Sequence, residues 1–160
     1  MVRFSRRAVV STVLALMTLA PPSSAGEVGG FLTWPTPTDR WNTGFGFHAA
    51  IISLPFLQAG GEWARMGGEN SLLSVSTYTA QAELNPPGLK ISPFVGVGFG
   101  GYHQNDGKSG DWGSLTAIFG GVRVPIGMAR LRAEFRKVSL SGTPQVNIDK
   151  RFSLGVSFRF

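Results

Sequence analysis

Few side chains in this sequence have the chemistry that catalysis needs. The chain contains two histidines, His48 and His103, and no cysteine. His103 precedes a polar segment with Asp106, Ser109 and Asp111, residue types that in a fixed arrangement supply a base, a nucleophile and an orienting acid. A polar loop does not by itself hold three groups in such an arrangement, so we predict no catalytic residues there. We expect His48, which lies among glycines, to be an interior residue that hydrogen-bonds to an acidic neighbour.

Two further segments resemble ligand-binding motifs but lack the context that those motifs require. Residues 96–101 match the dinucleotide pattern G-x-G-x-x-G, yet no helix pattern follows them. Residues 105–111 carry oxygen ligands suitable for calcium but lack the glutamate spacing of a helix-loop-helix site. The absence of cysteine excludes disulfides, thiol catalysis and cysteine-ligated metals. We therefore predict no metal site and no cofactor.

The charged residues themselves follow a period of two, which is typical of β-strands with two different faces. In one segment Arg130, Arg132, Glu134 and Arg136 alternate with Ala129, Leu131, Ala133 and Phe135. At the end of the chain Arg151, Ser153, Gly155, Ser157 and Arg159 alternate with Phe152, Leu154, Val156, Phe158 and Phe160. Both segments are therefore predicted to be strands with one apolar and one polar face.

The same periodicity predicts eight strands and an all-β fold. The other six are expected at residues 26–34, 41–53, 56–66, 71–84, 89–102 and 112–124. Short turn-forming connections at 54–55, 85–88 and 125–127 alternate with mostly longer polar ones at 35–40, 67–70, 103–111 and 141–150. This alternation predicts an antiparallel up-and-down meander that closes into a barrel, with both termini at one end.

Two segments leave the facing of their side chains open. Between residues 71 and 84 the apolar positions change parity, which predicts a β-bulge. In the segment 112–124, Ile118, Val122 and Val124 share one face while Phe119 falls on the other.

Three features favour a membrane barrel, with its apolar face outward, over a soluble barrel with an apolar interior. First, the meander places the four tryptophans and one tyrosine at the long-loop end, as an interfacial aromatic girdle requires; these are Trp34, Trp41, Trp63, Trp112 and Tyr102. Second, glycines on the polar faces, such as Gly44, Gly46, Gly96 and Gly98, leave room for long side chains inside a narrow barrel. Third, the chain ends on an aromatic residue of an alternating strand.

The final strand, residues 152–160 (FSLGVSFRF), resembles the C-terminal strand of Gram-negative outer-membrane barrels, and residues 91–98 and 120–125 resemble strands of the small OmpA-like family. The resemblance implies an eight-stranded transmembrane barrel in the outer membrane, surrounded by its lipid and lipopolysaccharide. It also implies that Phe158 and Phe160 form the assembly signal read by the barrel-assembly machinery.

The N-terminus has the organisation of a cleavable signal peptide, predicted at residues 1–25, with the barrel at 26–160. Arg3, Arg6 and Arg7 precede an apolar run at 8–20 and the small residues 23–25. The run is shorter than the ~20 residues of a membrane helix. Removal of these three of the 15 basic residues leaves 12 against 9 acidic residues, so the charge gives little reason to expect nucleic acid as a partner.

An eight-stranded barrel has an interior only wide enough for side chains. Charges removed from water need partners, and so we predict an interior ionic plug made of Glu62, Arg130, Arg132, Glu134, Arg136, Arg151 and Arg159, with Glu83 as a further candidate. A narrow channel for small solutes remains the alternative.

The expected role is structural or interactive, with an unidentified extracellular ligand or partner meeting the loops at 35–40, 103–111 and 141–150. Lipid A deacylases are barrels with a similar strand plan, and that resemblance implies a histidine and a serine two residues apart near the outer end of the seventh strand. Residues 135–140 contain Ser139 but no histidine. We therefore expect no enzyme activity, and a lipid A-modifying hydrolase stays an alternative.

Overall fold

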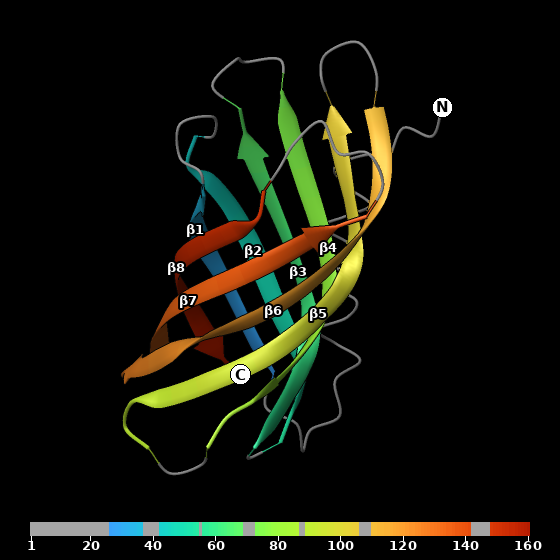
Figure 1. The fold of residues 1–160 in the computed structure, drawn as a ribbon. Helices are drawn as coiled ribbons and strands as arrows, with labels where there is room; N and C mark the ends of the chain where they lie inside the picture. The colour runs from blue at the N-terminus through green and yellow to red at the C-terminus, as the bar shows by residue number, and fades with distance from the viewer. Residues whose placement is uncertain are drawn as a thin grey trace.

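The computed structural model describes residues 26–36, 42–54, 56–68, 73–86, 89–105, 110–141 and 148–160. They form eight strands: β1 Glu27–Thr36, β2 Gly44–Ser53, β3 Leu57–Gly67, β4 Ser74–Leu84, β5 Ser92–Asn105, β6 Gly110–Ile126, β7 Ala129–Leu140 and β8 Lys150–Arg159. Each strand pairs antiparallel with its neighbours in sequence, and the order closes into a barrel (Figure 1). The predicted all-β, up-and-down architecture is thus confirmed. The predicted signal peptide lies outside the described residues.

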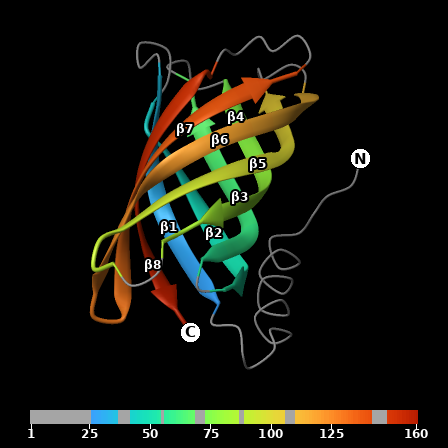
Figure 2. The ribbon, with the colours of Figure 1, turned by 60° about the horizontal axis from the view of Figure 1, so that its bottom comes forward.

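The barrel closes through a continuous ladder between its first and last strands. This ladder runs from Glu27 opposite Arg159 to Thr36 opposite Lys150, without a break in register. Figure 2 shows the C-terminal end of β8 beside the start of β1. Closure leaves no strand with an unpaired edge. The described residues include no helix that is long and apolar enough to cross a membrane.

The connections give the barrel two different ends. The strand ends at residues 53 and 57, 84 and 92, and 126 and 129 define what we call the turn end, where Phe160 N also donates a hydrogen bond to Gly26 O at 3.0 Å. Gly127, with φ of 61°, has the left-handed conformation that favours glycine in the tightest of these turns. The opposite end, where β5 meets β6 and β7 meets β8, is called the loop end.

The ladder between β5 and β6 extends further toward the loop end than predicted. It reaches Asn105 opposite Gly110, so His103 and Asp111 belong to strands and not to the expected loop at 103–111. The rings of His103 and Trp112, which are paired across this ladder, lie 4.7 Å apart. Such a cross-strand aromatic contact stabilises strand pairing in a segment that is polar in sequence.

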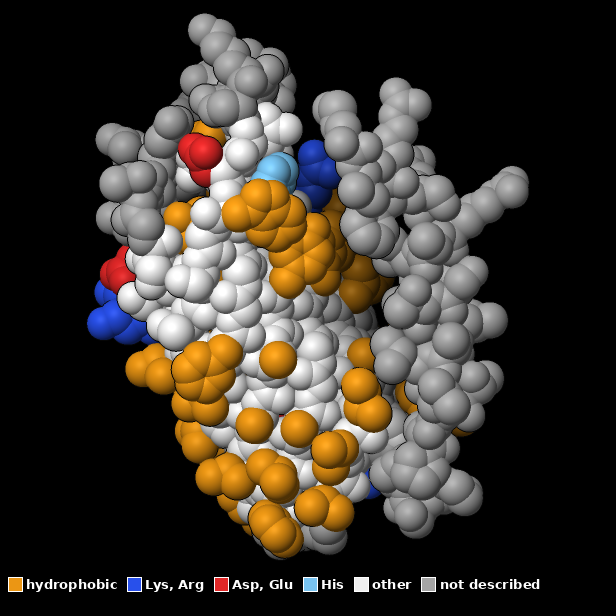
Figure 3. Space-filling view, turned by 90° about the vertical axis from the view of Figure 1, so that its right-hand side faces the viewer, with side chains coloured by type: hydrophobic (Ala, Val, Ile, Leu, Met, Phe, Trp, Pro, Cys, Tyr) orange, Lys and Arg blue, Asp and Glu red, His pale blue; other side chains and the backbone are white. Residues whose placement is uncertain are grey.

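The two faces of the sheet differ sharply in chemistry. Large apolar side chains are exposed on the outer face of the strands, for example Phe99, Ile118 and Phe135, while arginines and glutamates on the inner face are buried. Figure 3 shows apolar side chains across one outer side of the molecule. The final strand follows the same rule, because Phe152, Leu154, Val156 and Phe158 are exposed and Arg151, Ser153 and Ser157 are buried.

The predicted bulge in the segment 71–84 is wrong. β4 pairs with both neighbours in uninterrupted register, and Val75 points inward while Tyr78 points outward. The apolar parity changes because the interior itself is apolar at this height, and no residue is inserted. A bulge occurs instead in β2 between Ala50 and Ile52, which leaves Ile51 and Ile52 both exposed.

An apolar cluster fills the barrel interior toward the loop end. It consists of Met66, Val75, Tyr102, Leu115, Ala117, Val138 and Ile148. Tyr102 was predicted to join the outer aromatic girdle, and this was wrong: its ring is buried in the cluster and its hydroxyl donates to Ser141 O at 3.2 Å. Among the predicted girdle residues, Trp63 stacks outside on Phe47 and Trp112 is 68% exposed, while Trp41 lies outside the described residues.

Adjacent glycines opposite the bulge give a sharp test of this backbone arrangement. A Cβ on Gly60 would lie 1.9 Å from Ala49 O, whereas a Cβ on Gly61 would have no atom nearer than Thr79 O at 3.8 Å. We expect Gly60→Ala to lower the free energy of unfolding by about 1–3 kcal/mol, as overpacking does. Gly61→Ala should change it by less than about 0.5 kcal/mol. Urea unfolding in detergent micelles, followed by tryptophan fluorescence, measures both, and equal midpoints would contradict the register.

Candidate functional site

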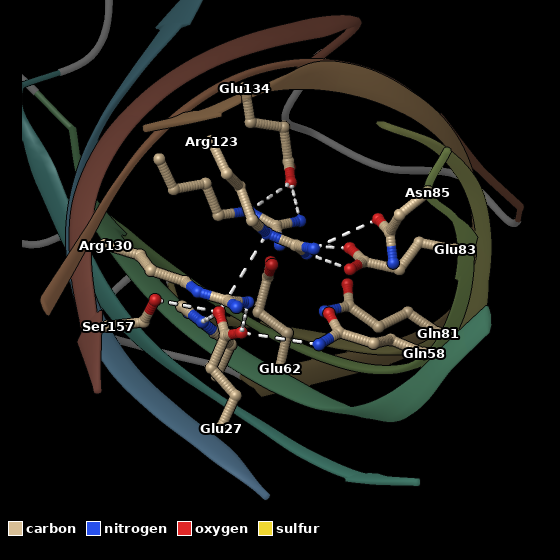
Figure 4. Close-up of polar contacts among 12 residues, drawn as sticks. Glu27, Gln58, Glu62, Gln81, Glu83, Asn85, Arg123, Arg130, Glu134 and Ser157 are labelled. Atoms are coloured by element: carbon tan, nitrogen blue, oxygen red, sulfur yellow. Dashed lines mark hydrogen bonds and ion pairs between the residues drawn. The ribbon is translucent and has the colours of Figure 1, made fainter. Parts of the chain in front are cut away.

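The most distinctive feature of the interior is a group of charged side chains that point to the barrel axis (Figure 4). Glutamates come from β1, β3, β4 and β7, and arginines come from β6, β7 and β8. We call this group the ionic network; its members are Glu27, Glu62, Glu83, Glu134, Arg123, Arg130, Arg132, Arg136 and Arg151. All are buried except Arg130, whose side chain is 26% exposed.

The part of the network furthest from the turn end centres on β7. Glu134 accepts hydrogen bonds from Arg136 Nε at 2.8 Å and from Arg132 Nη2 at 2.5 Å. Arg136 Nη2 also donates to Glu62 Oε2 at 2.7 Å, and Arg151 donates to the other oxygen of Glu62. Each buried carboxylate in this part is therefore shared by two guanidinium groups.

The same sharing continues toward the turn end. Arg132 Nη1 donates to Glu83 Oε2 at 3.0 Å, and Arg123 donates to the other oxygen of Glu83. Arg123 Nε lies 3.9 Å from Glu27 Oε1, and Arg130 Nη1 donates to Glu27 Oε2 at 3.1 Å. The contacts thus form one chain of alternating sign: Arg151, Glu62, Arg136, Glu134, Arg132, Glu83, Arg123, Glu27 and Arg130.

The alternation of arginine and glutamate in this series explains how so many charges can be buried. Removal of an ion from water costs several kcal/mol unless partners replace the water. Four buried arginines balance the four glutamates, and Arg130, the remaining cation, is the member that keeps contact with solvent. Neutral groups satisfy further oxygens, because Ser157 Oγ donates to Glu27 at 2.7 Å.

Inward-facing aromatic rings lie against three of the guanidinium groups. The Arg132 and Arg123 guanidinium carbons lie 4.1 and 4.6 Å from the centre of the Phe94 ring, and that of Arg136 lies 4.4 Å from the Phe119 ring. A cation over the face of an aromatic ring is attracted by the electrons of that ring. The buried position of Phe119 also settles the facing that the sequence left open in β6, because Phe119 points inward.

The structure joins six of the seven predicted plug residues in the ionic network and separates one. Arg159 has the inward parity of β8, but it is the last residue of the strand and is exposed, and no ion pair within the described ranges includes it. Its inclusion was wrong because parity says nothing about height in the barrel. Glu27 and Arg123 were missed. Ile118 and Val122 share the outward face of β6, and Arg123 has the opposite parity. This alternation was the signal in the sequence that could have placed Arg123 inside the barrel.

His48 is buried beside the network but is not hydrogen-bonded into it. Its Nε2 atom lies 3.6 Å from Glu27 Oε1, longer than a hydrogen bond, so the predicted bond to an acidic neighbour is not formed. The His48 ring stacks on Phe31, with 6.3 Å between ring centres. A small cavity of about 10 Å³ beside His48 and Gln58 is close to the smallest size that can hold one water molecule.

The candidate catalytic residues that the structure describes do not come together in one site. Ser139 lies on the outer face of β7 and His48 lies inside the barrel, so the sheet separates them. His103 contacts Trp112, and Asp106 and Ser109 lie outside the described residues. Within the part of the chain that the structure describes, no group of three or more His, Asp or Glu side chains could hold a metal ion.

The sequence matches no protein-family model and no curated protein. The fold does match solved structures. That of neisserial surface protein A (NspA) aligns with a TM-score of 0.60 at 13% identity and covers 85% of this chain and 95% of that chain. The N-terminal β-barrel domain of Pseudomonas aeruginosa OprF aligns with a TM-score of 0.61 at 15% identity and covers 86% and 98%. The chain is therefore similar in fold to small eight-stranded barrels, here with an apolar outer face and an ionic interior.

The alternating series of charges in the ionic network predicts a large difference between two arginine substitutions. Arg136→Met leaves Glu62 and Glu134 each with one guanidinium partner fewer, and we expect it to lower the free energy of unfolding by about 3–5 kcal/mol. Arg159→Met, the matched control outside the network, should change it by less than about 0.5 kcal/mol. Denaturant titration of the refolded barrel in micelles measures both. A similar loss for the two variants would mean that the network does not carry this stability.

Proposed function

We propose that the chain is an outer-membrane β-barrel with a structural or surface-interaction role. The observation that carries the proposal is the inverted sheet, with large apolar side chains exposed outside and nine charged side chains grouped inside. A soluble barrel has the opposite arrangement, because water and not lipid surrounds it. Lipid offers no hydrogen bonds to a sheet edge, and closure between β1 and β8 removes that edge.

The filled interior supports a sealed barrel over a channel. The ionic network occupies the barrel from the turn end, and the apolar cluster around Tyr102 and Leu115 fills it toward the loop end. A solute would have to displace both layers. The narrow channel considered from the sequence is therefore the less favoured proposal, and so is the lipid A hydrolase, because Ser139 and His48 lie on opposite faces.

In this proposal the loop end faces the cell exterior, and the connections there meet an extracellular partner. The apolar outer face contacts membrane lipid and lipopolysaccharide. Residues 1–25 act as the export signal that is cleaved, and Phe158 and Phe160, both exposed at the end of the chain, act as the signal for the barrel-assembly machinery.

Expression in a Gram-negative host tests location and sealing together. We expect the protein in the outer-membrane fraction, with faster migration of the unheated than of the heated sample on a denaturing gel. In planar bilayers we expect no steady conductance at protein amounts at which a general porin conducts. Recovery as a soluble periplasmic protein would contradict the location. Step conductances whose ion selectivity changes in Arg132→Glu would show a channel instead.

The assembly signal has a separate test. Phe160→Ala should reduce the heat-modifiable protein in the outer membrane several-fold, while refolding of the purified chain in detergent stays close to normal. Phe56→Ala, which removes another exposed phenylalanine near the turn end, is the matched control. Equal amounts of both variants in the outer membrane would remove this role for Phe160.

A further inference from the structure

Two lysines on the outer face have no evident reason to be there in the barrel alone. Lys137 of β7 and Lys150 of β8 are exposed, point outward and lie directly opposite each other in the ladder. Each lies two residues closer to the loop end than an outward phenylalanine, Phe135 or Phe152. No ion pair among the described residues includes either lysine. Like charges directly opposite on a sheet are destabilising, so the pair is suited to an anion from outside the chain.

A shallow apolar groove of about 760 Å³ ends at Lys137, the β7 member of this pair. It crosses the outer face from Leu57 of β3 to Lys137 of β7. A row of outward side chains lies on each side of it, and the residues of each row are paired from strand to strand across the sheet. Val95 and Ile118 belong to its walls, and Gly120 widens it because it has no side chain. Glu83, which also borders the groove, directs its carboxylate inward to Arg123 and Arg132. Lys137 therefore supplies the charge at one end of an otherwise apolar surface.

We propose that the groove and the lysine pair form a binding site for the lipid A part of lipopolysaccharide. This inference rests on the proposed function, which places the loop end in the outer leaflet. A phosphate of the headgroup lies between Lys137 and Lys150, and an acyl chain follows the groove past Ile118 and Val95 toward Leu57. Lysine suits this position because its methylene stem packs on apolar surface while its ammonium group reaches the headgroup level. A phosphate neutralises the repulsion between the two ammonium groups.

The test uses the full barrel, refolded in detergent and mixed with purified bisphosphorylated lipid A, with retention measured by native mass spectrometry. We expect the double variant Lys137→Gln/Lys150→Gln to retain lipid A about 30-fold more weakly, because each lysine near a membrane surface contributes about 1 kcal/mol toward an anionic lipid. Lys90→Gln, which removes an exposed lysine near the turn end, should bind as the unsubstituted protein does. Ile118→Trp, which fills the groove without changing charge, should also weaken retention.

Three outcomes would overturn the site: equal retention by the double variant and Lys90→Gln, no retention by the unsubstituted barrel, or equal retention of lipid A from which the phosphates have been removed. Heat-modifiable migration of every variant is recorded alongside. If the variants fold as barrels and bind lipid A alike, the site fails while the proposed membrane barrel stands. If the unsubstituted chain does not form a heat-modifiable barrel, both fail together.

Discussion

The structure depends on the pairing of charges in a narrow interior that leaves little room for water. Eight strands enclose an interior that is only wide enough for side chains, and an arginine buried there needs a carboxylate partner. In this chain the requirement is met by sharing, because each of the four glutamates lies between two arginines along one continuous series. The aromatic rings of Phe94 and Phe119 contact three of these arginines, Arg123, Arg132 and Arg136.

The ionic network also explains why the outer face can be apolar. The closed sheet has two faces with different surroundings, and the charged residues of the network are gathered on the inner face, where they pair with one another. The apolar cluster toward the loop end shows that the interior is not polar along the whole barrel axis. There the interior returns to ordinary core packing, with Val75 and Leu115 as buried as in a soluble protein.

Much of this architecture could be predicted from the sequence, because the alternation around Arg132 and Leu154 encodes both the strands and their facing. What the sequence could not supply was height along the barrel axis. Arg159 shares the parity of Arg151 but lies at the end of its strand, and Tyr102 belongs to an inner layer and not to a girdle. Val75 led to the wrong prediction of a bulge for the same reason, because the barrel interior is apolar at its height. Glu27 and Arg123 joined the network through contacts between strands far apart in sequence, which a period of two within one strand does not contain.

The inverted sheet is the central claim, and site-directed spin labelling of β8 tests it most directly, since the chain has no cysteine to interfere. Single variants Ser153→Cys, Leu154→Cys, Val156→Cys and Ser157→Cys are labelled and reconstituted in lipid vesicles. The account predicts that labels at 154 and 156 collide with lipid-soluble oxygen far more often than with a water-soluble nickel complex, while labels at 153 and 157 are immobile and shielded from both. Labels at 154 and 156 that meet the nickel complex freely, or a reversed phase of the alternation, would contradict it.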